Sequence, residues 1–342
     1  MTICYTGDYN PDYPRHRVLI SGLRGNGVEV LECPIKTPRE LIRTIRTHNK
    51  KVDYFFMGYS DSRMVWLAKL FARKPILWDA FYSLYDNWVF DRKLVAPRSL
   101  KAYYYWFLDW ICCKSADIVI LDTYANIEYF RKTFHLGKKR LIRVLVGTDD
   151  VVMVPQPKDP QDKRFIVEFH GKYIPVQGVE YIIGAAKILQ SHADIHFVLV
   201  GDGQEYDKIR ALARDLQIHN VTFHPVVPYD QLSRFIADAD VCIGLVGNLD
   251  RGARAIPNKV YEASAMGRAS ITMDGPGIRE LYTDRENILL CKGGDPQDLA
   301  DKILELKNNP GLRASIAQNA HMLYLQHGTP KMIGKELVRD IS

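Results

Sequence analysis

Short apolar runs alternate with longer segments of helical periodicity along nearly the whole chain. The apolar runs predict strands at residues 1–5, 28–32, 52–57, 75–78, 116–121, 141–146, 165–169, 195–200, 221–224, 241–245, 269–272 and 288–291. Apolar positions three and four apart predict helices near residues 16–23, 39–48, 63–71, 100–113, 125–134, 178–190, 205–216, 229–237, 258–266, 278–282, 296–306 and 331–340. Strands that alternate with such helices form βαβ units around a parallel sheet. The pattern therefore predicts an α/β protein with two doubly wound, Rossmann-like sheets, one in each half.

A proline-rich polar stretch at residues 154–160 separates the two halves and is typical of a linker. We therefore expect a first domain at residues 1–153 and a second at 154–327, followed by a terminal helix at 328–342. Ligands of doubly wound sheets bind beyond the carboxyl ends of the strands. Two such sheets facing each other would place a site in the cleft between them.

The composition of the 342 residues is that of a globular protein, and the length favours two domains. With 47% hydrophobic and 25% charged residues, it excludes a disordered, collagen-like or coiled-coil chain. The six cysteines are scattered and form no C-x-x-C pair, which argues against a disulfide scaffold or a zinc ribbon. The first residues lack the pattern of a signal peptide, and no apolar run approaches the ~20 residues of a membrane span. We therefore expect a cytoplasmic protein with reduced thiols.

The net charge of +6 is unevenly distributed between the two halves. Residues 1–150 contain 24 Lys and Arg against 16 Asp and Glu, whereas residues 151–342 contain 22 against 24. A basic first half indicates an anionic partner, such as nucleic acid, an acidic membrane surface or a phosphorylated substrate. No helix-turn-helix, RNA-binding or basic-arm pattern is found, so nucleic acid is the least favoured of the three.

Two glycine-containing strand ends in the second half could accept an anionic ligand. The strand at 195–200 ends in Gly201-Asp202-Gly203, where a ligand could approach the backbone closely, although a plain strand-to-helix turn has the same residues. The strand at 165–169 continues as His170-Gly171-Lys172, which places a cation where a phosphate could bind at the start of the next helix. Lys172 could equally be a solvated surface lysine.

A third motif covers residues 256–267, with Pro257 suited to the first turn of a helix and Gly267 to its end. Lys259 and Glu262 are three residues apart and so share one helix face. The helix start at Asn258, together with Lys259, could hold a diphosphate, while Glu262 could accept hydrogen bonds from two ribose hydroxyls. The alternative for Lys259 and Glu262 is a weak surface ion pair.

The three motifs in this order resemble the retaining glycosyltransferases of family 4, which have the GT-B fold. The resemblance covers residues 165–306 well. It is looser in the first half, at residues 78–86 and 121–123. It implies an N-terminal acceptor-binding domain, a C-terminal domain that binds a nucleotide-sugar donor, and a last helix that crosses back to the first domain.

The resemblance assigns the donor contacts to particular residues. Lys172 matches a basic residue that binds the donor diphosphate, but Gln177 stands where the family often has a lysine. Glu262 matches the second glutamate of an E-x7-E motif and would hold the ribose. Arg254 occupies the position of the first glutamate, so it would bind phosphate instead of contacting the sugar.

The expected chemistry is electrostatic stabilisation of the leaving nucleoside diphosphate by Lys172, Lys259, Arg254 and the amides at Asn258. It needs no cofactor or metal, and Asp238-Ala239-Asp240, the one D-x-D match, fits a turn or cap better than a metal site. In the family's retaining mechanism the leaving phosphate takes the acceptor proton, so no separate protein base is required.

The acceptor is expected in the first half. Asp79 follows a predicted strand and is a candidate for orienting the acceptor or acting as a base, with a structural hydrogen bond as the alternative. Ser83 and Asp86 lie on the same loop, and Arg15-His16 could meet a phosphate at a helix start or be plain surface charge.

Aromatic and basic residues are interleaved between Arg92 and Trp110. The mixture suits an anionic membrane interface, although the same aromatics could form the core face of a helix. Together these features predict a glycosyltransferase that acts on a lipid-linked or polysaccharide acceptor. A nucleotide-sugar epimerase and a non-catalytic GT-B binding protein remain the alternatives.

Overall fold

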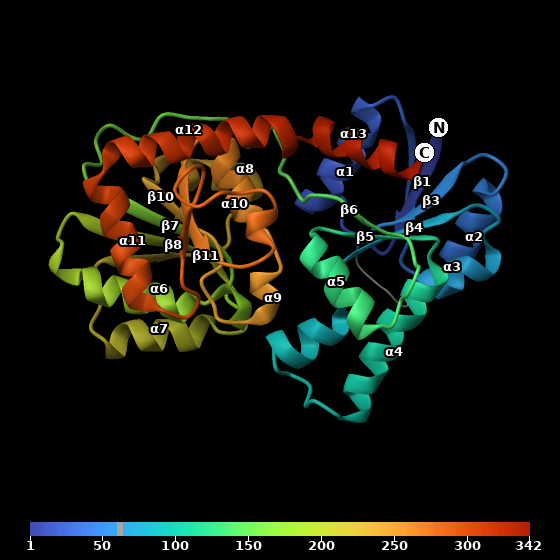
Figure 1. Ribbon diagram of the computed structural model, residues 1–342, viewed down its shortest axis with the longest axis horizontal. Coiled ribbons are helices and arrows are strands. Elements are labelled where there is room, and N and C mark those ends of the chain that lie inside the picture. The colour runs from blue at the N-terminus through green and yellow to red at the C-terminus, as the bar shows by residue number, and fades with distance from the viewer. Residues whose placement is uncertain (60–63) are drawn as a thin grey trace. The chain divides into compact units, whose positions relative to one another are not determined.

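The computed structural model describes residues 1–59 and 64–342, and the chain divides into two compact units (Figure 1). The first unit comprises Met1–Asp149 together with Thr329–Ser342, and the second comprises Asp150–Gly328. Each unit contains a six-stranded sheet in which all the strand pairs are parallel. The predicted fold class, two doubly wound α/β sheets, is confirmed.

The sheet of the first unit has the strand order β2-β1-β3-β4-β5-β6. Its strands are β1 (Thr2–Gly7), β2 (Glu29–Pro34), β3 (Tyr54–Met57), β4 (Ile76–Phe81), β5 (Ile118–Leu121) and β6 (Leu141–Arg143). Its helices are α1 (Pro14–Gly25), α2 (Pro38–His48), α3 (Val65–Phe71), α4 (Leu100–Ser115), α5 (Tyr124–Thr133) and α13 (Pro330–Ile341), with a π-helix at Asp86–Asp91. Helix α13 packs against α1, while α2, α3, α4 and α5 contribute to the core on the other face.

Local sequence signals account for several helix starts in this unit. Thr37 and Glu40 form a capping box at α2, and the side chains of Ser99, Thr123 and Thr329 accept backbone hydrogen bonds at the starts of α4, α5 and α13. These caps place each helix start directly after the loop that follows the preceding strand or helix.

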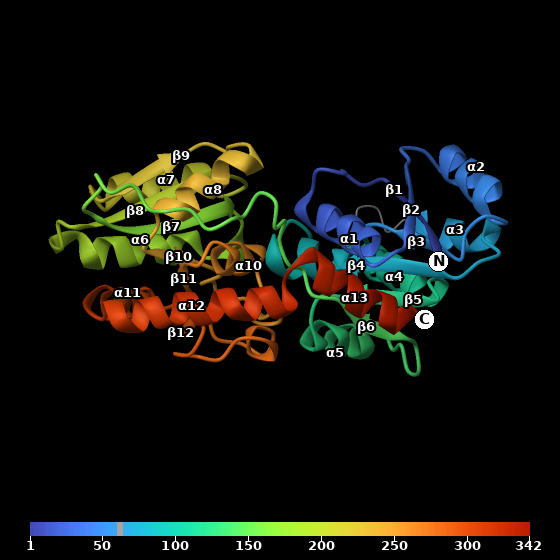
Figure 2. The same cartoon turned by 90° about the horizontal axis from the view of Figure 1, so that it is seen from above.

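The sheet of the second unit has the strand order β12-β11-β10-β7-β8-β9. Its strands are β7 (Phe165–Lys172), β8 (Ile195–Asp202), β9 (Val221–His224), β10 (Val241–Ile243), β11 (Ala269–Met273) and β12 (Leu289–Cys291). Its helices are α6 (Val179–Ile188), α7 (Tyr206–Asp215), α8 (Tyr229–Asp238), α9 (Asp250–Ala253), α10 (Asn258–Ala265), α11 (Pro296–Asn308) and α12 (Pro310–His327). Helices α6, α7 and α11 cover one face of this sheet, and α8, α10 and α12 cover the other (Figures 1 and 2).

All twelve predicted strands are found, with ends that shift by a few residues. Helix α12, the π-helix at Asp86–Asp91 and the short α9 were not predicted. Residue 63, the predicted start of the third helix, lies outside the described residues. Among the described helices, none combines the length and the apolar character needed to cross a membrane.

Candidate functional site

The three motifs of the second half meet at one edge of the second unit. Strands β7 and β8 pair in register, so that Gly171 lies beside Gly201 and Lys172 beside Asp202. On its other side β7 pairs with β10, which is the point where the strand order of this sheet reverses. Doubly wound sheets bind ligands at such a point, beyond the carboxyl ends of the strands.

The Lys259 side chain lies buried at this edge without a carboxylate partner. It is 5% exposed, its Nζ lies 4.4 Å from the centre of the Phe169 ring, and it donates a hydrogen bond to Gln177 Oε1. Among the described residues, no carboxylate oxygen approaches its Nζ within 4.0 Å. Burial lowers the pKa of Lys259 to about 8, although the charges of Glu262 and Glu168 oppose that shift. A buried ammonium of this kind favours an anionic ligand.

Gly171 leaves room for a ligand beside that ammonium. Its φ is +142°, a region that side chains rarely adopt, and a Cβ on this residue would lie 3.2 Å from Lys259 Nζ. A side chain here would therefore cover the cation. Lys172 follows on the exposed end of the strand.

Helix α10 presents its amino end to the same edge. Asn258 is its first residue, and no side chain caps it, because the preceding residue is Pro257. Uncapped N–H groups at a helix start attract anions, and here they lie next to the Lys259 side chain. The helix has eight residues, of which seven are buried, so its position is held by the core.

A buried histidine joins two glutamates just below this edge. His170 Nδ1 lies 2.8 Å from Glu168 Oε1, and its Nε2 lies 2.7 Å from Glu262 Oε2. Burial alone would lower the pKa of His170, but the two carboxylates outweigh it and raise the pKa to about 9. The imidazole is therefore charged at neutral pH and binds one oxygen of Glu262. Within the described part of the chain, Glu262 Oε1 makes no hydrogen bond.

Arg254 and the Gly201-Asp202-Gly203 turn lie in surroundings that favour an anionic ligand less than those of Lys259. The Arg254 guanidinium is buried and forms an ion pair with Asp250, one turn earlier. A carboxylate partner reduces the positive potential that this arginine offers to a phosphate. Asp202 is exposed and accepts a hydrogen bond from the N–H of Gly203, 2.6 Å away, as in a turn.

The predicted acceptor residues of the first unit form buried structural contacts. Both oxygens of Asp79 accept hydrogen bonds from Arg15, at 2.7 Å each, and both side chains are fully buried. The aspartate charge also raises the pKa of Arg15, against the lowering effect of burial. The structure thus favours the structural alternative for Asp79, and a fully buried Arg15 does not present its charge at the surface.

His16, Ser83 and Asp86 are buried as well. His16 binds the Tyr5 hydroxyl at 2.8 Å and the carbonyl of Tyr59 at 2.9 Å, and burial lowers its pKa. Ser83 Oγ accepts from the N–H of Asp86 at 3.0 Å and donates to Asp109 at 2.6 Å. These contacts hold the loop after β4 in place, and a role in acceptor binding stays a prediction.

Comparison with known proteins identifies the family. Residues 154–322 match the family model described as glycosyl transferases group 1. The matched residues, all in the second unit, belong to this family. An uncharacterized glycosyltransferase of Methanocaldococcus jannaschii is 28% identical over 226 residues, which cover 66% of this chain. The lipopolysaccharide core biosynthesis glycosyltransferase LpsE of Rhizobium meliloti is 27% identical over 214 residues, which cover 61% of this chain. Each match covers 59% of the length of that relative.

The likeness in fold to solved structures extends over both units. The crystal structure of Anabaena HepE in complex with UDP-glucose matches 100% of this chain and 99% of that protein, with a TM-score of 0.76 and 15% identity. At that identity the likeness shows the fold, which is GT-B.

The two aspartates of the D-x-D match form structural contacts. Asp238 accepts from the N–H of Asp159 and from Arg234, and Asp240 accepts from Lys158 and from the N–H of Ile166. Among the described residues, no group of three or more His, Cys, Asp or Glu side chains is arranged to hold a metal ion.

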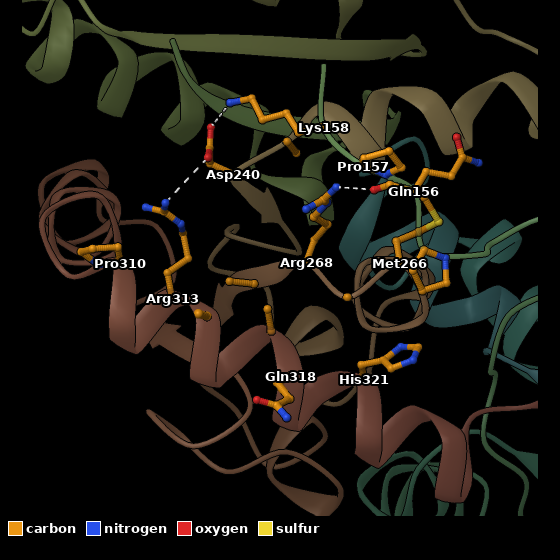
Figure 3. Close-up of a pocket in the computed structure, with 16 residues that line it drawn as sticks. Gln156, Pro157, Lys158, Asp240, Met266, Arg268, Pro310, Arg313, Gln318 and His321 are labelled. Carbon is orange, nitrogen blue, oxygen red and sulfur yellow. Dashed lines mark hydrogen bonds and ion pairs between the residues drawn. The ribbon is translucent and has the colours of Figure 1, made fainter. Parts of the chain in front are cut away.

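A hollow of about 720 Å³ lies at the other end of the strands of the second sheet, near the amino ends of β10 and β11 (Figure 3). Lys158 and Arg313 lie 2.5 and 3.9 Å from the two oxygens of Asp240, and Arg268 donates to the carbonyl of Gln156 at 2.7 Å. These cations already have partners, and of the three motifs only the far end of the third, at Met266 and Gly267, reaches this hollow.

Sequence reasoning missed Glu168 and His170 as members of the site. Both lie on β7, where every second side chain points to the same face, so Glu168, His170 and Lys172 form one row. That spacing was visible in the sequence. The pairing with Glu262, 92 residues away, was not.

Proposed function

We infer that the protein transfers a sugar from a nucleoside diphosphate sugar to a lipid-linked or polysaccharide acceptor, with retention of configuration. The observation that carries this proposal is the buried Lys259 ammonium at the carboxyl end of β7. It lacks a carboxylate partner among the described residues and lies beside Gly171, which has no side chain to occupy the space next to the Nζ. HepE, with the same fold, was crystallised with UDP-glucose, which supports a nucleotide-sugar donor.

The geometry of the second unit supports a particular set of donor contacts. The diphosphate would lie at Lys259 and the first amides of α10, with Lys172 at its exposed side and Arg254 as a weaker contributor. The ribose hydroxyls would donate to Glu262 Oε1, since Oε2 is bound to His170. The backbone of Gly201-Asp202-Gly203 would border the same ligand, because β8 pairs with β7 there.

The reaction breaks the bond between the sugar carbon and the β-phosphate oxygen and forms one to the acceptor oxygen. Negative charge builds on the leaving diphosphate, and a nearby desolvated cation lowers that barrier. In the proposed retaining course, the acceptor attacks from the face that the diphosphate leaves, and its hydroxyl proton passes to the leaving phosphate. The protein cations supply the stabilising charge, so the proposal requires neither a metal nor Asp79.

The acceptor class and the location are supported by separate observations. LpsE is named for lipopolysaccharide core biosynthesis, which favours a lipid-linked or polysaccharide acceptor here. Five of the six cysteines are buried and hold their sulfur as a thiol, which agrees with a cytoplasmic location.

A binding protein without catalysis is the second candidate. Gln177, which stands where the family often has a lysine, is neutral and accepts from Lys259 instead of offering a second charge. If the absence of this second charge abolishes sugar transfer, the protein would bind a nucleotide sugar without catalysing a reaction.

A thermal-shift titration with UDP, GDP, ADP, CMP and dTDP tests the donor site. A ligand at 100 times its Kd adds about 2.7 kcal/mol of stability. Lys259→Met should weaken binding of the active nucleotide by about 10- to 100-fold, the value of a charged hydrogen bond. Lys292→Met removes an exposed lysine of the same unit and should change nothing. No shift with any nucleotide, or full binding by Lys259→Met, would overturn the proposal.

A further inference from the structure

Helix α4 exposes an apolar stripe on the first unit. Leu100, Tyr103, Tyr104 and Phe107 occupy positions i, i+3, i+4 and i+7 of this helix, so they share one face. All four are exposed, and Leu100 reaches 90%. We call these four residues the α4 stripe. A helix face of this kind normally packs against a core.

The opposite face of α4 supplies the core contacts. Ala102, Leu108, Cys112 and Cys113 are buried, and Trp106 donates its ring N–H to the carbonyl of Thr133 at 3.0 Å. The aromatic residues of this segment therefore divide between two roles. Trp106 packs inward, as the core interpretation predicted, whereas the stripe is left on the surface.

Exposed apolar side chains are concentrated in this region. Among the described residues, 16 large hydrophobic side chains are exposed, and six of them fall between Phe90 and Phe107. Four of these six form the α4 stripe, and the other two, Phe90 and Leu94, lie in the segment that leads into α4. Such a cluster marks an interaction surface, because single exposed apolar residues are normally scattered.

The charges around the stripe identify its partner. Lys93, Arg98 and Lys101 are exposed, while Asp86 and Asp91 are buried. Every exposed charge between residues 84 and 110 is therefore positive. Aromatic rings flanked by cations suit the headgroup region of an anionic bilayer, where the rings lie at the interface and the cations meet lipid phosphates.

We propose that the α4 stripe and its flanking cations dock the protein on an anionic membrane surface. The role of this docking rests on the proposed function: membrane binding would bring the first unit to a lipid-linked acceptor. Binding to lipid and binding of nucleotide use different units, so each can be tested without the other. The cationic half of the sequence, residues 1–150, agrees with this surface.

Vesicle flotation of the full-length protein tests the docking surface. We expect binding to vesicles of phosphatidylcholine and phosphatidylglycerol in equal parts, at least tenfold weaker binding to phosphatidylcholine alone, and loss of binding as salt rises from 0.1 to 0.5 M. Equal binding to both vesicle types, or no binding to either, would overturn the proposal.

Two sets of variants locate the surface. One variant replaces apolar residues of the stripe, as Leu100→Ser/Tyr103→Ser/Phe107→Ser. The other reverses two flanking charges, as Lys93→Glu/Lys101→Glu. Each variant should reduce vesicle binding at least tenfold. Leu70→Ser and Lys50→Glu/Lys51→Glu make the same kinds of change at exposed positions elsewhere on the first unit and should bind as the wild type does.

Nucleotide thermal shifts and sedimentation velocity complete the test. All variants should keep the nucleotide shift of the wild type, so a loss of docking is separated from a failed donor site. If the serine variant instead converts a dimer to a monomer and vesicle binding is unaffected, the stripe is a protein interface and the proposal is wrong.

Discussion

At the scale of single residues, His170 makes stability depend on pH in a definite direction. Its pKa rises from 6.5 to about 9 in the folded chain, so the folded state holds a proton that the unfolded state releases between these values. The stabilising contribution is complete below pH 6.5 and is lost as pH rises through about 9. The shift corresponds to about 3 kcal/mol.

Urea unfolding of the wild type and His170→Gln from pH 6 to 10 measures this contribution. Lys259 titrates in the same range with the opposite sign, because its lowered pKa makes stability rise with pH, so the difference between the two proteins is the informative quantity. The variant should be less stable near pH 6.5, and the gap should close towards pH 9.5. As a control, His219→Gln alters an exposed histidine of the same unit and should follow the wild type. A difference in unfolding free energy between the wild type and His170→Gln that does not change with pH would contradict a charged His170.

The buried pair of Arg15 and Asp79 gives a second prediction at this scale. Asp79→Asn leaves the Arg15 guanidinium buried without a countercharge, which should cost about 3–5 kcal/mol of unfolding free energy. Arg15→Met/Asp79→Leu removes both charges and should recover most of that loss. If Asp79→Asn keeps its stability but loses sugar transfer, Asp79 has the acceptor role that the sequence suggested.

At the scale of elements, α1 and α13 pack closely through two glycines. A Cβ on Gly334 would lie 2.1 Å from the carbonyl oxygen of Gly22, and a Cβ on Gly22 would lie 2.2 Å from that of Pro330. Gly334→Ala should therefore force the helices apart and cost about 1–3 kcal/mol. Gly25→Ala, in the same α1 but facing open space, should be neutral or slightly stabilising. Urea unfolding compares the two, and equal effects would contradict close packing.

The strands were predictable from sequence because a buried parallel strand is a continuous apolar run. Helix α12 was missed because its sequence has no clear apolar face. Its buried residues are Ile316, Ala320 and Tyr324, which lie among polar residues, and the apolar Met322 and Leu325 are exposed. The three glycine- and lysine-containing motifs of the second unit could be recognised because each is contiguous in sequence. Their tertiary partners were not found: Arg15 and Asp79 are 64 residues apart, and no local pattern links them.

At the scale of the whole molecule, the chain passes between the units twice, at residues 149–150 and 328–329. The second unit is one continuous segment with its own core. The first unit depends on a helix from the far end of the sequence, since α13 buries Ile333, Leu337 and Ile341. Each such side chain contributes about 1.5–3 kcal/mol, which together approaches the total stability of a typical domain.

This arrangement predicts different behaviour for the two fragments. Residues 150–328 should unfold cooperatively in urea and bind the active nucleotide within about threefold of the full-length affinity, because the site and its core lie in that segment. Residues 1–149 should show little cooperative unfolding. The two chain termini lie near each other in both views (Figures 1 and 2), so residues 329–342 joined by a short Gly/Ser linker before Met1 should restore a cooperative transition. The same fusion with Gly334→Val should fail to restore it, since the side chain would collide with the backbone of Gly22. A stable 1–149 fragment would show that α13 covers a unit that is already complete.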